Sequence, residues 1–291
     1  MLPALVFLAL TAFAAALLWS SHASRAAALH LILAAGAMPL IFGAMSHFIP
    51  VLTRTRSAPG ALAILPVLAL AGGALVVAAL GFPGMLWGQP AGALLAVTAA
   101  GALFVWSRRR RAGMLGRPHP CLDWYEAALL CLVAALLAIL ASAIWPQQAP
   151  ALRRLHLHLN TLGFVGLTAM ATLAVLLPTV TGRPDPQVGP RLRRDLPWAV
   201  AGTLLVAFGA AWYGPLAWIG GALWAIPPMR LGARSLQLHR AEIVALHGAA
   251  PPLTAALAGL VGSAMLGAVN VIPAAATFHS VQPAWAFIAG F

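Results

Sequence analysis

The chain has 291 residues, of which 62% are hydrophobic and only 8% are charged. A soluble domain carries roughly 25% charged residues, so this composition excludes an ordinary soluble enzyme. It indicates an all-α, polytopic membrane protein in which residues 1–291 form a single integral membrane domain. The net charge is +12, and every basic residue is an arginine. The arginines lie in short stretches between apolar segments. That distribution predicts membrane topology and not nucleic-acid binding.

A membrane-spanning helix needs about 20 apolar residues, and eight to ten such segments occur in this chain. The first begins without the basic residues of a cleaved signal and is predicted to be a helix. Only Gly214-Pro215 separates the seventh segment from the eighth, which predicts either a tight hairpin or two half-spans. Residues 232–250 are either an amphipathic connection or the first part of the ninth helix. The expected spans are about 2–20, 26–52, 58–81, 90–107, 123–145, 155–181, 196–213, 215–231 and 251–272, with a weak tenth ending at Phe291.

The arginines are unevenly divided between the two sides of this predicted bundle. Fourteen lie in loops on the side of the N-terminus, and three, Arg25, Arg153 and Arg154, lie on the other side. The positive-inside rule then places the N-terminus in the cytoplasm. The expected location is the cytoplasmic (inner) membrane of a bacterium. The run Arg108 to Arg111 is the strongest candidate among them for binding anionic lipid or protein.

A histidine pair, His156-Leu-His158, opens an apolar segment that has no charged side chain as far as Val180. Ionisable groups at such a depth are costly and usually have a function. Residues two apart on a helix point about 200° away from each other, so the two imidazoles face different neighbours. His30 stands near the start of another predicted span that runs in the same direction. We expect all three imidazoles at a similar depth, close to the outer face.

A weak internal repeat links the two histidine-bearing spans. Pro50 follows His30 by twenty residues, and Pro178 follows His158 by the same twenty. A threonine follows each proline by three residues. The repeat pairs His30 with His158, and two histidines from facing helices can hold a haem iron from both sides. The alternative is that each histidine only hydrogen-bonds a backbone carbonyl or a neighbouring helix.

Other residues that could bind a metal are weaker candidates. His47, His239 and His247 are predicted to share the cytoplasmic side and could form a second metal site. His22 and His119 are expected in loops, and His279 in the tail. Asn160 and Asn270 could orient imidazoles from behind or make ordinary contacts between helices. Copper is an alternative metal, since methionines could form a path for it, although apolar packing explains them as well; they are Met38, Met45 and Met170.

Two stretches resemble the catalytic subunit of the haem-copper oxidases. Met38-Pro39-Leu-Ile-Phe-Gly-Ala-Met-Ser-His47-Phe-Ile-Pro50 is similar to that family's second helix, which carries a haem histidine about ten residues before Met-Pro. His156-Leu-His158, followed by Gly163 and Leu-Leu-Pro178, is similar to its tenth helix. The resemblance implies that His30 and His158 ligate a low-spin haem b and that His156 ligates a second haem.

The chain departs from that family in three ways. It has no His-His pair for a copper centre, its only tyrosines are Tyr125 and Tyr213, and about four helices are missing between the two similar stretches. The five acidic residues, all expected at the cytoplasmic boundary, support no proton path. The chain thus looks like a shortened relative, akin to the NnrS-type haem membrane proteins, and is not expected to be a proton-pumping oxygen reductase.

The expected function is a b-type haem membrane protein, with one or two haems, that transfers electrons or handles a diatomic gas such as nitric oxide or oxygen. Expected partners are the lipid bilayer and an electron donor or acceptor, either a protein or a quinol, within a larger membrane complex or alone. One alternative is a metal or haem transporter or an assembly factor for a respiratory complex. Another is a structural subunit whose histidines only make polar contacts.

Overall fold

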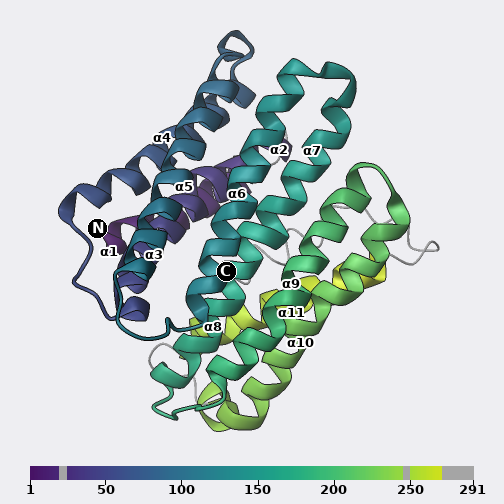
Figure 1. Ribbon diagram of the computed structural model, residues 1–291. Coiled ribbons are helices and arrows are strands. Elements are labelled where there is room, and N and C mark those ends of the chain that lie inside the picture. The colour runs from purple at the N-terminus through teal and green to yellow at the C-terminus, as the bar shows by residue number, and fades with distance from the viewer. Residues whose placement is uncertain (20–24, 245–249, 271–291) are drawn as a thin grey trace. The chain divides into compact units, whose positions relative to one another are not determined.

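The computed structural model is all-helical over the residues it describes, which are 1–19, 25–244 and 250–270 (Figure 1). The predicted fold class is confirmed at this level. The chain forms two compact units. Unit 1 comprises Met1–Leu122 with Leu132–Ala149, and unit 2 comprises Asp123–Cys131 with Pro150–Phe291.

Unit 1 is built around one long, interrupted helix that carries His30. The interruption is a π-helix, η1 (Leu31–Ala37), which separates α2 from α3. Helices α1 and α4 pack on this segment. Helices α4 and α5 form a hairpin whose connection contains one short 3₁₀ turn, η3. The elements are α1 (Leu2–Trp19), α2 (Arg25–His30), η1, α3 (Met38–Thr53), η2 (Gly60–Ala63), α4 (Ile64–Gly81), η3 (Pro83–Met85) and α5 (Gly88–Ala112).

Unit 2 has a second interrupted helix, which carries His156 and His158. Here the π-helix is η5 (Leu159–Gly166), between α7 and α8. The following two helices, α9 and α10, again form a hairpin. Helix α6 (Cys121–Ile144) contributes residues to both units. The remaining elements are η4 (Pro146–Gln148), α7 (Ala149–His158), α8 (Leu167–Val180), α9 (Val188–Ala211), α10 (Gly214–Val244) and α11 (Ala250–Asn270).

Five helical segments of the described chain are long and apolar enough to cross a membrane, which supports the predicted transmembrane character. Helices α1 and α11 contain shorter apolar stretches, Leu2–Leu18 and Pro251–Met265. Helices α9 and α10, predicted as the seventh and eighth spans, are not among the five. The five are Ala26–Thr53, Gly60–Gly81, Gly88–Ala112, Cys121–Ile144 and Pro146–Val180.

Several helices are longer than the apolar pattern predicts. Helix α7 begins at Ala149, so the histidine pair lies two turns inside a helix and not at its start. Helix α9 begins at Val188, and α10 continues to Val244 with a kink at His239. Most arginines predicted for loops therefore lie within helices. Arginine favours helix and can keep its guanidinium outside an apolar bundle, so charge alone does not mark a helix boundary.

Glycines allow the helices of each hairpin to approach closely. In unit 1, a Cβ added to Gly72 would lie 2.6 Å from the carbonyl oxygen of Gly92 on the facing helix. In unit 2, a Cβ on Gly202 would lie 2.5 Å from the backbone nitrogen of Trp224. Only Trp212 and Tyr213 separate α9 from α10, and the two helices pack on each other as a tight hairpin. Whether they are full spans or half-spans stays a prediction.

Candidate functional site

His30 and His158 occupy equivalent places in their units. His30 is the last residue of α2 and directly precedes η1, and His158 is the last residue of α7 and directly precedes η5. Their backbone angles are nearly the same, φ −69° and ψ −33° for His30 and φ −73° and ψ −35° for His158. π-Helical segments inside α-helices are rare and frequently occur at functional sites.

Each of these imidazoles is anchored to its own helix by one ring nitrogen. Nδ1 of His30 donates to the carbonyl oxygen of Ala26 at 2.7 Å, and Nδ1 of His158 donates to that of Arg154 at 2.8 Å. A carbonyl oxygen only accepts, so in the neutral ring the proton is on Nδ1 and the lone pair is on Nε2. A backbone carbonyl behind Nδ1 is the usual support of a histidine that binds a metal through Nε2.

The far ends of the two histidine-bearing helices also match. The Thr53 hydroxyl donates to the carbonyl oxygen of Ile49 at 2.8 Å, and the Thr181 hydroxyl donates to that of Leu177 at 2.9 Å. The next residue has a positive φ in both units, 52° at Arg54 and 66° at Gly182. The repeat predicted from sequence spacing thus extends to the local structure from the histidine to the helix end.

The backbone hydrogen bonds that close these helix ends are equivalent as well. The N–H of Thr55 donates to the carbonyl oxygen of Pro50 at 3.0 Å, and the N–H of Arg183 donates to that of Pro178 at 3.1 Å. A bond spanning these positions, with a left-handed residue inside it, is the Schellman ending of a helix. Each histidine is therefore followed by the same sequence of devices: a π-helix, a proline and a Schellman ending.

Both π-helices lie against closely packed neighbours in their own unit. A Cβ on Gly73 of α4 would lie 2.2 Å from the carbonyl oxygen of Ala34 in η1. A Cβ on Gly163 in η5 would lie 2.6 Å from Cβ of Cys131 in α6, and one on Gly166 would lie 2.8 Å from the indole ring of Trp224 in α10. The backbone that carries each histidine is thus held in place by packing.

His156 has a different environment from His158, as the predicted 200° separation implies. The side-chain amide of Asn160 donates to the carbonyl oxygen of His156 at 3.0 Å. The same amide nitrogen lies 3.3 Å from both ring nitrogens of His156. Equal distances to the two nitrogens place the amide over the ring face, since an in-plane bond would favour one nitrogen. Asn160 thus contacts the ring of His156 on the same helix, and its role in orienting that ring stays a prediction.

His30 belongs to unit 1, and His156 and His158 belong to unit 2. The similar depth of the three imidazoles, and the sharing of one haem by His30 and His158, stay predictions. Asn270, the other predicted orienting residue, has its side chain outside the described part of the chain.

The predicted second metal site is divided in a similar way. His47 is exposed in unit 1, where its ring meets that of Phe48 edge to face at 5.4 Å. His239 is buried in unit 2, and its Nδ1 lies 2.9 Å from the Thr181 hydroxyl. His247, like His22 and His279, lies outside the described residues. Across residues 1–19, 25–244 and 250–270 no group of three or more His, Cys, Asp or Glu side chains could hold a metal ion.

The other histidine and the methionines have structural surroundings. His119 precedes α6, and its Nδ1 accepts from the backbone N–H of Cys121 at 3.2 Å. Met38, Met45 and Met170 are buried, which favours packing over a copper path.

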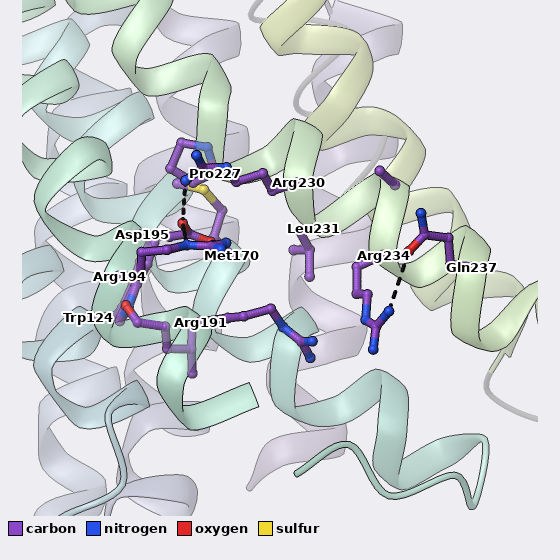
Figure 2. Close-up of a pocket in the computed structure, with 12 residues that line it drawn as sticks. Trp124, Met170, Arg191, Arg194, Asp195, Pro227, Arg230, Leu231, Arg234 and Gln237 are labelled. Carbon is purple, nitrogen blue, oxygen red and sulfur yellow. Dashed lines mark hydrogen bonds and ion pairs between the residues drawn. The ribbon is translucent and has the colours of Figure 1, made fainter. Parts of the chain in front are cut away.

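Three of the acidic residues form ion pairs with arginines, which the sequence did not predict. Asp185 pairs with Arg191, Glu242 pairs with Arg183 at 2.6 Å, and Asp195 pairs with Arg194 and Arg230, both at 2.9 Å. A cavity beside Asp195 is bordered by arginines of α9 and α10 (Figure 2). The sequence predicted those arginines in loops and did not predict the cavity. The arginines of α9 and those of α10 are far apart in the sequence and come together only in the hairpin.

Comparison of the chain with protein-family models, curated proteins and solved structures gives no match. The resemblance to the haem-copper oxidase subunit therefore depends on the residues quoted above.

Proposed function

We propose that this chain is a multi-pass b-type haem protein of a bacterial inner membrane, with His30 and His158 as axial ligands of one haem. The observation that carries the proposal is the repeated histidine: in each unit, Nδ1 is bonded to the carbonyl oxygen four residues earlier, and a π-helix follows at once. This arrangement presents Nε2 with its lone pair, which is the donor that haem iron takes from histidine.

The residues fit a haem in a further respect. The two candidate histidine ligands are neutral donors, and apolar side chains are abundant along both histidine-bearing helices. A porphyrin ring needs such surroundings, and a ferrous or ferric iron between two imidazoles supplies one-electron transfer. The protein's own contribution is to hold each ring through the backbone and through the packed π-helix, so that little movement accompanies a change of iron charge.

His156 is proposed to serve a second haem or a gas-binding position. Its ring is separated from that of His158 by one residue and is covered on one face by the Asn160 amide. A haem with one histidine ligand has an open position for nitric oxide or oxygen, whereas a haem between two histidines does not. Electron transfer therefore requires only the repeated pair, and gas handling requires His156 in addition.

The proposed topology has eight to ten spans with the N-terminus in the cytoplasm. It is supported by the excess of arginine on one predicted side and by the five long apolar helices. The proposed partners are an electron donor or acceptor protein or a quinol. Proton-pumping reduction of oxygen is not proposed, because the sequence lacks the histidine pair of a copper centre.

The test is purification of the full-length protein from membranes, followed by haem and metal analysis. We expect a coloured protein with a reduced-minus-oxidised spectrum of b-type haem, confirmed by pyridine haemochrome and iron content. His30→Ala and His158→Ala should each abolish the low-spin spectrum, while His47→Ala, an exposed histidine of unit 1, should retain it. A colourless wild-type protein that binds haem or metal only transiently would favour the transporter or assembly-factor alternative.

A further inference from the structure

Unit 2 contains a cavity of about 340 Å³ bordered by residues of α6, α8, α9 and α10 (Figure 2). This volume is at the lower end of the range of small-ligand sites, about 300–1,000 Å³. Arginines dominate its polar border, two from α9 and two from α10. The polar lining consists of Arg191, Arg194, Asp195, Arg230, Arg234 and Gln237.

Among the described residues that line the cavity, Asp195 carries the only carboxylate, against four guanidinium groups. Arg194 donates to both oxygens of that carboxylate, at 2.9 and 3.1 Å, and Arg230 donates to one of them at 2.9 Å. Asp195 is therefore already shared between two cations. The border of the cavity keeps an excess of positive charge.

The other two arginines have less compensation within the cavity. Arg191 pairs with Asp185, which does not line it. Arg234 has one long hydrogen bond, 3.4 Å from its Nη1 to the side-chain oxygen of Gln237. Its Nε is buried and has no hydrogen-bond partner within the described residues. A buried donor without an acceptor is costly, and an anion in the cavity could supply one.

The electrostatics agree with this geometry. Burial lowers the pKa of Arg191, and the neighbouring charges of Arg234 and Arg194 lower it further, while Asp195 opposes the change. Cations so close to one another repel, and a bound anion would relieve the repulsion.

We propose that this cavity binds a phosphate group, carried either by the headgroup of an anionic phospholipid or by a small soluble phosphate compound. The planar fork of a guanidinium matches two phosphate oxygens, and several forks around one cavity favour phosphate over a single carboxylate. Trp124, Met170 and Leu231 form apolar parts of the wall, next to which the carbon portion of such a ligand fits. The site is separate from the histidines, and the inference does not depend on haem binding.

The experiment measures thermal unfolding of the full-length detergent-solubilised protein with three probes. The first is inorganic phosphate against chloride at equal ionic strength. The second and third are a short-chain phosphatidylglycerol and a short-chain diacylglycerol that lacks the phosphate. We expect a saturable rise in unfolding temperature with phosphatidylglycerol and none with diacylglycerol. A rise with inorganic phosphate as well would identify a free phosphate as a sufficient ligand, and its absence would identify the lipid headgroup.

The matched variants are Arg191→Gln/Arg234→Gln and Arg193→Gln/Arg240→Gln. Both remove two charges from α9 and α10, but Arg193 and Arg240 are exposed and lie outside the cavity lining. The first pair should weaken phosphate binding by about tenfold or more, since charge-assisted hydrogen bonds are lost. The second should change it by less than about twofold, because exposed charges are screened by salt.

A third variant, Arg234→Lys, covers the case in which the double variant fails to fold. It keeps the charge and loses the fork, so binding should weaken while the fold is retained. Equal losses in the two double variants, or no saturable effect of either phosphate probe on the wild-type protein, would overturn the proposal.

Discussion

The two units repeat one device and differ in what surrounds it. In each, a histidine anchored to its own helix precedes a π-helix, a proline and a Schellman ending. Unit 2 adds a second histidine, His156, and the arginine-bordered cavity between its helices. The histidine present in both units suits a haem that needs two equivalent ligands. His156 and the cavity, present only in unit 2, suit functions that need a single site. The following changes test that division.

The largest effects are expected where the glycines hold the helices together. Gly73→Val in unit 1 and Gly202→Val in unit 2 would each place side-chain atoms inside a backbone contact, 2.2 and 2.5 Å from the nearest atom. Each should destabilise the protein by about 3 kcal/mol or more, because backbone atoms cannot move aside. Thermal unfolding and the yield of folded protein measure this loss.

Suitable controls are Gly101→Val and Gly221→Val, where nothing lies within 4 Å of an added Cβ. These should remain close to wild type. If Gly73→Val were tolerated while Gly202→Val was not, close backbone contact at glycine would not stabilise the two units to the same extent.

The next prediction separates the repeated histidine from the additional one. His156→Ala should retain the low-spin b-type spectrum, since that spectrum needs only His30 and His158, but should lose binding of carbon monoxide to the reduced protein. His158→Ala should lose the low-spin spectrum. Optical spectra of the reduced proteins with and without carbon monoxide distinguish the two variants. An identical effect of both substitutions would show that the adjacent histidines act as one site.

Arg54 and Gly182 occupy the same left-handed position at the two helix ends, and only one of them is glycine. A residue with a Cβ costs about 1–2 kcal/mol in this conformation. Gly182→Ala should therefore destabilise by about 1 kcal/mol, and Arg54→Gly should stabilise by up to about 1 kcal/mol. Thermal unfolding of the two variants should shift in opposite directions, and shifts of the same sign would contradict the equivalence of the two ends.

The smallest effect concerns pH and His239 of unit 2. Burial lowers the pKa of His239, and Arg183, Arg191 and Arg234 lower it further against an opposing effect of Glu242. The unfolded chain therefore takes up a proton first as the pH falls below about 6.5. The stabilisation is complete above that pH and is lost as the pH falls towards the folded pKa.

His239→Gln should remove this dependence, which we expect to be about 1 kcal/mol or less. Unfolding temperatures at about pH 7.5 and about pH 5.5 measure it, since carboxylates titrate at lower pH. A variant with the same pH dependence as the wild type would assign the effect to another group.

The sequence predicted the elements whose apolar pattern is unbroken and missed features that depend on contacts. Spans expected at 26–52 and 251–272 lie close to the observed helices Ala26–Thr53 and Ala250–Asn270. The helical starts of α7 and α9 were missed because they carry arginine, which the hydropathy pattern assigns to loops. The π-helices share no marker in composition, since Leu31–Ala37 is apolar throughout and Leu159–Gly166 contains Asn160 and Thr161.

The candidate site was predictable to a similar extent. The equal spacing from His30 to Pro50 and from His158 to Pro178 indicated the repeat. Residues of one helix lie at distances set by their separation in the sequence, so such a repeat can be seen without the structure. The cavity was not predictable, because Arg191 and Arg234 approach each other only through the packing of the α9–α10 hairpin.

The contact between Cys131 and Gly163 gives unit 2 a built-in chemical probe. The thiol is 7% exposed, and its Sγ would lie 2.9 Å from a Cβ placed on Gly163. Separation of α6 and η5 would expose that sulfur to an alkylating reagent. The rate at which Cys131 is alkylated therefore reports how often η5, the segment that follows His158, moves away from α6. No label has to be engineered into the chain.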